Sequence, residues 1–202
     1  MTRTARLLAV AALCAAPACS VADDKATARP APSESSSAPP TARQTPEPPC
    51  RDAPPQQRGE ATLRSLPTAW RASGVTVRFE QGQPGLLGET TMNKPLRVTI
   101  YVRPCAEESD ALLRHVVAHE LGHAWDRYRM TPVLRDGYLA MRRINTSTPW
   151  FGCDGCEDFA TPAGDFAETY AQWLRGSVES RSELGPAATP EQLEQIAARF
   201  FR

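Results

Sequence analysis

The sequence lacks an excess of charge of either sign. Its 202 residues include 23 lysines and arginines against 23 aspartates and glutamates, so the formal net charge is zero. No cluster of basic residues stands out along the chain. A protein that binds nucleic acid or an anionic membrane surface by charge needs a basic patch or stripe. The composition therefore argues against both classes of partner.

A long hydrophobic run is missing as well. The apolar stretch from Leu7 to Ala18 is shorter than the roughly 20 residues that a membrane-spanning helix needs. It follows two arginines and ends in small residues, which is typical of an export signal over residues 1–19. The end of this signal, Ala16-Pro17-Ala18-Cys19, is similar to a bacterial lipobox. The sequence therefore predicts a protein that is secreted freely or lipid-anchored through Cys19 at the outer face of the bacterial cell membrane.

Residues 20–58 contain few aliphatic or aromatic side chains, and nine of the chain's 19 prolines fall there. Such a segment cannot bury enough apolar surface to offset the entropy lost on ordering. We therefore expect a disordered linker over residues 20–58 and a folded domain over residues 59–202. A length of about 140 residues is ordinary for one domain.

Four cysteines follow the signal: Cys50, Cys105, Cys153 and Cys156. A second Cys-x-x-Cys pair is missing, so Cys153 and Cys156 cannot complete a four-cysteine zinc knuckle. An even number of cysteines in an exported chain predicts structural disulfides. The sequence leaves their pairing open.

Histidine is scarce, and all three histidines lie in one short stretch that includes His119-Glu120-Leu121-Gly122-His123. Histidines four residues apart lie on one face of a helix and can direct ring nitrogens at one ion. Zinc accepts such ligands and leaves a position for water, whose proton Glu120 can take. The motif therefore predicts a zinc site with Glu120 as catalytic base.

The alternative is an ordinary amphipathic helix whose histidines happen to lie one turn apart. His115 is two turns from His123, too far to share its ion, so we expect it to pack or to support a ligand.

Apolar periodicity and capping residues predict an α+β fold, in which a short antiparallel sheet is combined with an active-site helix and C-terminal helices. Ser109 and Thr161 are typical helix caps. The expected helices cover residues 60–73, 110–129, 132–143, 161–174 and 190–201, and the clearer strands cover residues 75–79 and 96–102.

A catalytic zinc site needs a third protein ligand, and no fourth histidine is present. The cysteines are better explained as disulfides in an exported protein. Asp165 and Glu168, on the helix that begins after Thr161, are the candidates for the third ligand. Glu168 is preferred because its long side chain points away from the apolar stripe of that helix. Both acids would instead serve the helix start if Asp165-Phe166-Ala167-Glu168 were a capping box.

The stretch His119 to Asp126, followed by Asp165-Phe166-Ala167-Glu168 on a later helix, resembles a zincin metallopeptidase. It is most similar to the group that contains the catalytic domain of anthrax lethal factor, which has a His-Glu-x-x-His-x-x-Asp helix. The resemblance implies a zincin-like fold, a glutamate-ligated zinc and a water-mediated attack on a peptide bond. The sequence departs from that group at Gly164, where the group tends to have its ligand acid. It also has no tyrosine between Tyr138 and Tyr170 to stabilise an oxyanion.

These patterns predict an exported, monomeric, zinc-dependent peptidase that acts on peptides or proteins. His119 and His123, with Glu168 or Asp165, would hold Zn²⁺. The strand over residues 96–102, if it lay at an exposed edge, would pair with an extended substrate. The alternative is a zincin-like binding or envelope-structural module without turnover, and Gly164 and the missing tyrosine favour it.

Overall fold

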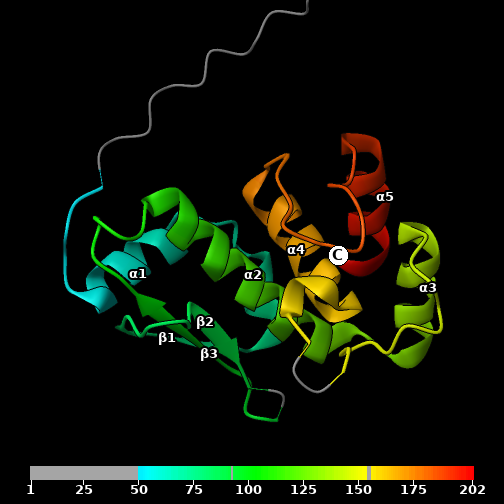
Figure 1. The fold of residues 1–202 in the computed structure, drawn as a ribbon, viewed down its shortest axis with the longest axis horizontal. Coiled ribbons are helices and arrows are strands. Elements are labelled where there is room, and N and C mark those ends of the chain that lie inside the picture. The colour runs from blue at the N-terminus through cyan, green and yellow to red at the C-terminus, as the bar shows by residue number, and fades with distance from the viewer. Residues whose placement is uncertain (1–49, 92, 154–155) are drawn as a thin grey trace, which may run out of the picture. The chain divides into compact units, whose positions relative to one another are not determined.

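The computed structural model describes residues 50–91, 93–153 and 156–202 (Figure 1). In this part of the chain, five α-helices and three strands form an α+β fold, the class that the sequence predicts. The signal and residues 20–49 of the predicted linker lie outside the described residues. Both therefore stay predictions.

The sheet is mixed. Its strands β1 (Thr76–Gln81), β2 (Gly88–Thr90) and β3 (Arg97–Val102) lie in the order β1-β3-β2. β1 runs parallel to β3, and β2 runs antiparallel to it. The prediction of an antiparallel sheet is therefore wrong for the β1–β3 pair. Alternation along a strand indicates which side chains face the core, but strand direction depends on the connection between strands.

β3 is the central strand and hydrogen-bonds to a neighbour along both sides. Five of its six residues are buried. The condition set for substrate pairing along residues 96–102, an exposed edge, is therefore not met. The edge of the sheet beside the helix that carries the histidines is formed instead by the short strand β2.

The helix expected over residues 60–73 is divided into α1 (Pro55–Arg64) and the 3-10 helix η1 (Thr68–Ser73). Pro67 explains the break, because a proline disfavours helical geometry in the residue before it. α1 begins before the expected domain start. The Arg58 side chain, which is 5% exposed, pairs with Asp110 at 3.0 Å, so this end of the predicted linker is packed onto the domain.

The remaining helices begin at side-chain caps, close to where the sequence predicts them. In each case a serine or threonine oxygen accepts a hydrogen bond from a backbone N–H in the first turn, which satisfies one of the otherwise unpaired donors. These helices are α2 (Asp110–Arg129, capped by Ser109), α3 (Pro132–Arg142, Thr131), α4 (Pro162–Arg175, Thr161) and α5 (Pro190–Phe200, Thr189).

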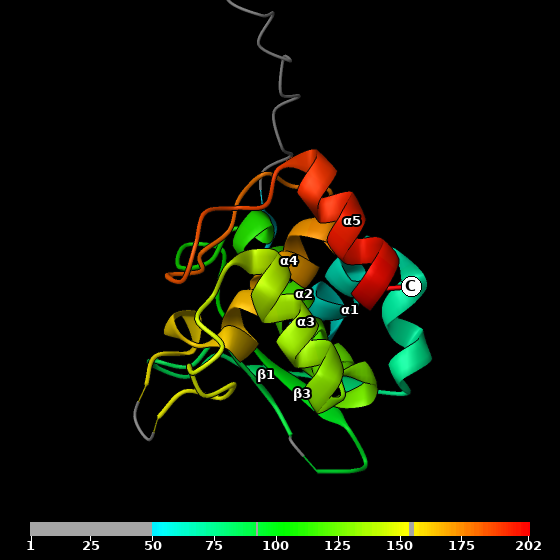
Figure 2. The ribbon, with the colours of Figure 1, turned by 90° about the vertical axis from the view of Figure 1, so that its right-hand side faces the viewer.

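α2 and α4 cross in close contact at the centre of the fold, and α1 and α2 lie along one side of the sheet (Figure 1). Gly122 of α2 lies directly against the backbone of Ala167 in α4. α3 and α5 pack together beyond α4 (Figure 2). There, the Trp125 indole N–H donates to the Phe200 carbonyl at 2.8 Å. The core therefore fixes the position of α2 from two sides.

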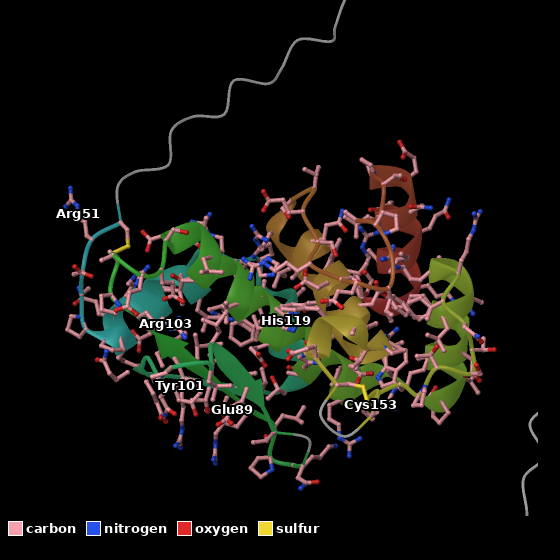
Figure 3. All side chains as sticks on the ribbon, viewed as in Figure 1. Arg51, Glu89, Tyr101, Arg103, His119 and Cys153 are labelled. Atoms are coloured by element: carbon pink, nitrogen blue, oxygen red, sulfur yellow. A yellow bond between two sulfur atoms is a disulfide. The ribbon has the colours of Figure 1, made fainter. Side chains whose placement is uncertain are left out.

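Two disulfides confirm the expected role of the four cysteines (Figure 3). Cys50 pairs with Cys105 and ties the segment before α1 to the loop after β3. Cys153 pairs with Cys156 within the loop that precedes α4. In the part of the chain that the structure describes, no helix has the length and hydrophobicity needed to cross a membrane.

The α2–α4 contact predicts that Gly122→Ala destabilises the protein. An added Cβ would lie 2.7 Å from Ala167 Cα and 2.9 Å from the Ala167 carbonyl oxygen, both of them backbone atoms. Overpacking of this kind costs about 1–3 kcal/mol or more, which exceeds the ~1 kcal/mol that alanine gains over glycine in a helix. We expect a lower free energy of unfolding and a lower Tm, measured by chemical and thermal denaturation.

Gly137→Ala in α3 is the matched control. There the nearest atom to the added Cβ is the end of the flexible Arg199 side chain, at 2.9 Å. This variant is expected to be as stable as the wild type or more stable, because alanine has the higher helix propensity. Equal stability of the two variants would contradict the close approach of α2 and α4.

Candidate metal centre

The three histidines follow one another at intervals of one turn along α2, where it faces α4. His115 and His119 are buried, and the His123 side chain is 14% exposed. Figure 3 shows His119 at the junction of the two helices. The spacing therefore brings the histidines to one face, as the sequence predicts.

His119, His123 and Asp158 form a triangle of potential ligand atoms. His119 Nε2 lies 3.1 Å from His123 Nε2 and 2.8 Å from Asp158 Oδ2, and His123 Nε2 lies 3.2 Å from the same oxygen. Ligands about 2.0–2.1 Å from a tetrahedral zinc ion are separated by roughly 3.4 Å. The triangle is therefore close to the size that a zinc ion requires, and these residues form one of two groups in the described chain that could hold a metal ion.

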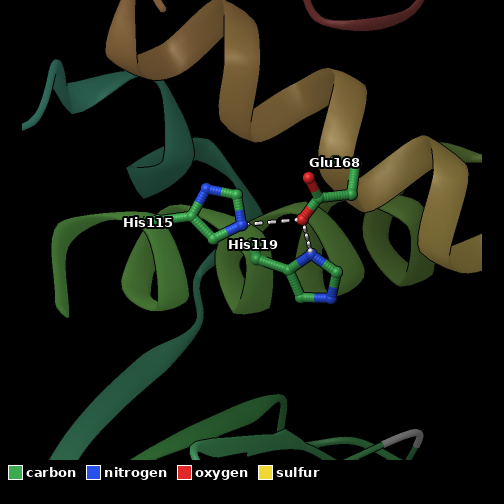
Figure 4. Close-up of side chains that lie close together, drawn as sticks. All are labelled: His115, His119 and Glu168. Carbon is green, nitrogen blue, oxygen red and sulfur yellow. Dashed lines mark hydrogen bonds and ion pairs between the residues drawn. The ribbon is translucent and has the colours of Figure 1, made fainter. Parts of the chain in front are cut away.

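The second group that could hold a metal ion consists of His115, His119 and Glu168 (Figure 4). The Glu168 carboxylate is fully buried, and its Oε1 lies 2.9 Å from His115 Nε2 and 2.8 Å from His119 Nδ1. Its other oxygen accepts the backbone N–H of Arg181. Glu168, the third ligand preferred from the sequence, thus contacts Nδ1 of His119, whereas Nε2 of the same ring belongs to the triangle.

Hydrogen bonds distinguish the two groups. Arg175 Nη1 lies 2.6 Å from His115 Nδ1, and arginine can only donate, so Nδ1 accepts. The proton of a neutral His115 therefore lies on Nε2, where it is donated to Glu168. His119 donates to the same oxygen through Nδ1. In the second group, each ring nitrogen that faces Glu168 donates a proton to that carboxylate. Because a neutral His119 carries its proton on Nδ1, its Nε2 keeps a lone pair that points into the triangle.

Asp158 is the residue that the sequence analysis missed. It begins the 3-10 helix η2 (Asp158–Ala160), just before the Thr161 cap of α4. The triplet Asp-Phe-Ala occurs twice, at residues 158–160 and 165–167, and only the second copy matches the resemblance to zincins. The sequence did offer one signal, a second carboxylate closer to His123 than Asp165 is. A 3-10 turn in a loop has no periodicity, however, so the sequence does not reveal where its side chains point.

Asp165, the other predicted candidate ligand, lies outside both groups. Its carboxylate is fully buried and pairs with Arg142 of α3 at 2.7 Å, and it also accepts from Tyr138 and Ser182. Asp126 of α2 pairs in the same way with Arg135 of α3 at 3.0 Å. The two acids thus hold α3 against α2 and α4, and neither belongs to a group that could hold a metal ion.

Glu120 faces the sheet beside the triangle. The Thr90 hydroxyl in β2 donates to Glu120 Oε2 at 2.7 Å. Gly88 of β2 leaves room for the side chain, because a Cβ there would lie 2.7 Å from Glu120 Cγ. β2 therefore holds the carboxylate in place.

Glu120 and the triangle line one cavity of ≈ 730 Å³. β2 and the chain before it form one wall, α2 forms the floor, and the loop that leads into α4 forms the opposite wall. Much of the lining is apolar, contributed by Leu86, Leu87, Val116, Phe151 and Phe159. The cavity is large enough for several residues of a bound chain, since ligand pockets span about 300–1,000 Å³.

The electrostatics of the centre favour a cation. Burial by itself would lower the pKa of His119, but hydrogen bonds to Asp158 and Glu168 outweigh it and raise the pKa to about 10. Burial would raise the pKa of Asp158, yet hydrogen bonds from His119 and His123 hold it well below its usual range. Burial would also raise the pKa of Glu168, and hydrogen bonds from His115 and His119 hold it well below its usual range. Two ionised carboxylates therefore surround His119.

No family model, no curated protein and no solved structure matches this chain. The conclusions about the centre therefore depend on its residues and their geometry.

Proposed function

We propose that this chain is an exported zinc-dependent peptidase in which His119, His123 and Asp158 hold the metal. The observation that carries the proposal is the triangle of ligand atoms, none more than 3.2 Å from another, in the cavity that Glu120 also lines. Two imidazoles and one carboxylate are a donor set of catalytic zinc sites, in which the fourth position is left for water.

Glu168 supports the metal site without being a ligand in this proposal. Its carboxylate accepts the Nδ1 proton of His119, which fixes the ring and directs Nε2 toward the ion. This role replaces the ligation predicted for Glu168 from the sequence. His115 in turn donates to Glu168 and helps to keep that carboxylate ionised.

Zinc in such a site supplies Lewis-acid chemistry and lowers the pKa of bound water toward about 7. Glu120 accepts the proton of the water and passes it to the leaving amine, as general base and then general acid. Its hydrogen bond to Thr90 keeps the carboxylate at the wall of the cavity. β2, whose outer side pairs with no strand among the described residues, offers backbone groups for an extended substrate.

The two disulfides support export, because such bonds persist in oxidising compartments. The same proposal includes the export signal, a lipid anchor at Cys19, the monomeric state and a peptide or protein as substrate.

One observation favours the second candidate, a binding or envelope-structural module without turnover. No tyrosine is present among the described residues that line the cavity, so the oxyanion stabiliser implied by the zincin resemblance has no counterpart there.

The proposed ligands predict how zinc content changes in variants. The wild type is expected to bind about one zinc per chain, and His123→Ala and Asp158→Ala should lose it, because a catalytic site needs three protein ligands. Glu168→Gln should weaken binding by about 10–100-fold, the usual effect of losing a partner of a ligating histidine. Metal content after dialysis and competition with a chelator would measure both effects.

Asp136→Asn, on the exposed side of α3, is the matched control and should retain zinc. Retention of zinc by Asp158→Ala together with complete loss in Glu168→Gln would show that the other group holds the metal.

Glu120→Gln tests the catalytic proposal. Hydrolysis of a peptide library, followed by mass spectrometry, should fall by about 10²–10⁴-fold, because the general base is lost. Zinc content should stay at the wild-type level. Glu107→Gln, at an exposed position outside the cavity, should keep full activity. Full activity in Glu120→Gln would contradict its role as general base, whereas no hydrolysis by a zinc-loaded wild type would favour the module without turnover.

The pKa of His119 predicts that zinc binding releases a proton. At pH 7 a group with a pKa of about 10 is protonated in the metal-free protein, so the metal must displace that proton. Apparent zinc affinity should therefore rise about tenfold per pH unit near neutrality and level off above the pKa. Calorimetry in buffers of different ionisation enthalpy would measure the released proton, and a pH-independent affinity would contradict the raised pKa.

A further inference from the structure

A second, smaller cavity adjoins the metal cavity at its His115 end. Its volume is ≈ 350 Å³, and it is lined by residues of the α2 N-terminus, by Arg175 and by the chain that follows α4. His115 and Arg181 line both cavities. The two cavities are therefore neighbours that share part of their lining.

Arg175 brings an incompletely compensated positive charge to this second cavity. Its side chain is 10% exposed, and Nη1 donates to His115. Its Nε is buried, and no described residue offers it an acceptor. The nearest acidic oxygen, Glu179 Oε2, is 3.9 Å from Nη2 and belongs to a side chain that is 79% exposed. Buried donors are normally paired, so this unpaired guanidinium nitrogen leaves Arg175, a residue of the cavity lining, with an acceptor missing.

Both signs of charge surround Arg175. Burial lowers its pKa first, the carboxylates of Glu179 and Glu168 oppose this effect, and repulsion by Arg114 and Arg181 adds to the lowering. Arg181 is exposed at the boundary of the two cavities, and its backbone N–H is anchored on Glu168. An anion between Arg175 and Arg181 would relieve this repulsion and provide the missing acceptor.

We infer that this second cavity is a subsite of the proposed peptidase for a carboxylate of the substrate, with Arg175 and Arg181 as its cationic groups. The inference rests on the proposed function. The carboxylate belongs either to an acidic side chain or to the C-terminus of the peptide. The ring centroids of His115 and His119 are 6.3 Å apart. An extended chain advances about 3.3–3.6 Å per residue, so about two residues are needed to reach His115, and the carboxylate lies at least that far from the scissile bond.

Peptide hydroxamates, which bind zinc through the hydroxamate group, test the subsite without a known substrate. One pair of probes has neutral side chains and ends in either a free carboxylate or a carboxamide. A second pair ends in a carboxamide and carries either glutamate or glutamine about two residues from the hydroxamate. Calorimetry would give the Kd of each probe with the mature, zinc-loaded chain, with Arg181→Met and with Arg78→Met.

Arg78 is the matched control, because it is an exposed arginine on β1, at the other edge of the sheet from β2. Arg181 is tested in preference to Arg175, whose loss would also disturb His115.

In the wild type, the acidic member of at least one pair should bind about tenfold more tightly than its neutral partner. Arg181→Met should remove most of this difference and leave the Kd of the neutral probes unchanged, and Arg78→Met should preserve it.

The pair that shows the preference identifies the source of the carboxylate. Equal binding of acidic and neutral probes, or a preference that survives in Arg181→Met, would overturn the subsite while binding of the neutral probes still supports the zinc site. A chain that takes up no zinc and binds none of the probes would overturn the proposed function, and the subsite with it.

Discussion

A single buried carboxylate, that of Glu168, joins the parts of the structure on which the metal centre depends. It extends from α4 to two histidines of α2 and accepts a backbone N–H from the chain after α4. A buried charge without such partners would be costly, and each partner removes part of that cost. The same hydrogen bonds determine the tautomer of His119. The packing of α2 on α4 and the chemistry of the candidate metal centre are therefore one constraint, and Gly122 permits the close approach of the two helices.

The charges are distributed unevenly along the histidine face of α2. Asp158 and Glu120 lie near its His119 and His123 end, whereas Arg175 contacts His115 at the other end. A cationic metal would complete the acidic end, and an anionic group of a ligand would complete the basic end. Substrate binding and metal binding would then be aligned along one helix, with Glu168 between them.

The start of α2 is fixed by the segment that precedes α1. Arg58 donates to the carbonyl oxygens of Arg103 and Glu108, and the Cys50–Cys105 disulfide closes the same region. These contacts surround Ser109, the cap of α2. At the other end of the site, the Cys153–Cys156 disulfide lies shortly before Asp158. An oxidising compartment would therefore suit both the helix that carries the histidines and the loop that carries Asp158.

The local features of this protein follow from its sequence alone. Spacing alone placed His119 and His123 on one helical face with Glu120 beside them, and Ser109 and Thr161 marked the starts of the two helices that meet at the site. These features depend on neighbours a few residues apart. Only the folded chain shows that β1 runs parallel to β3, that β2 forms an edge of the sheet, and that Asp158 lies with His119 and His123 while Glu168 lies with His115 and His119. Each of these depends on how distant segments return to α2, and the periodicity of a single segment carries no information about that return.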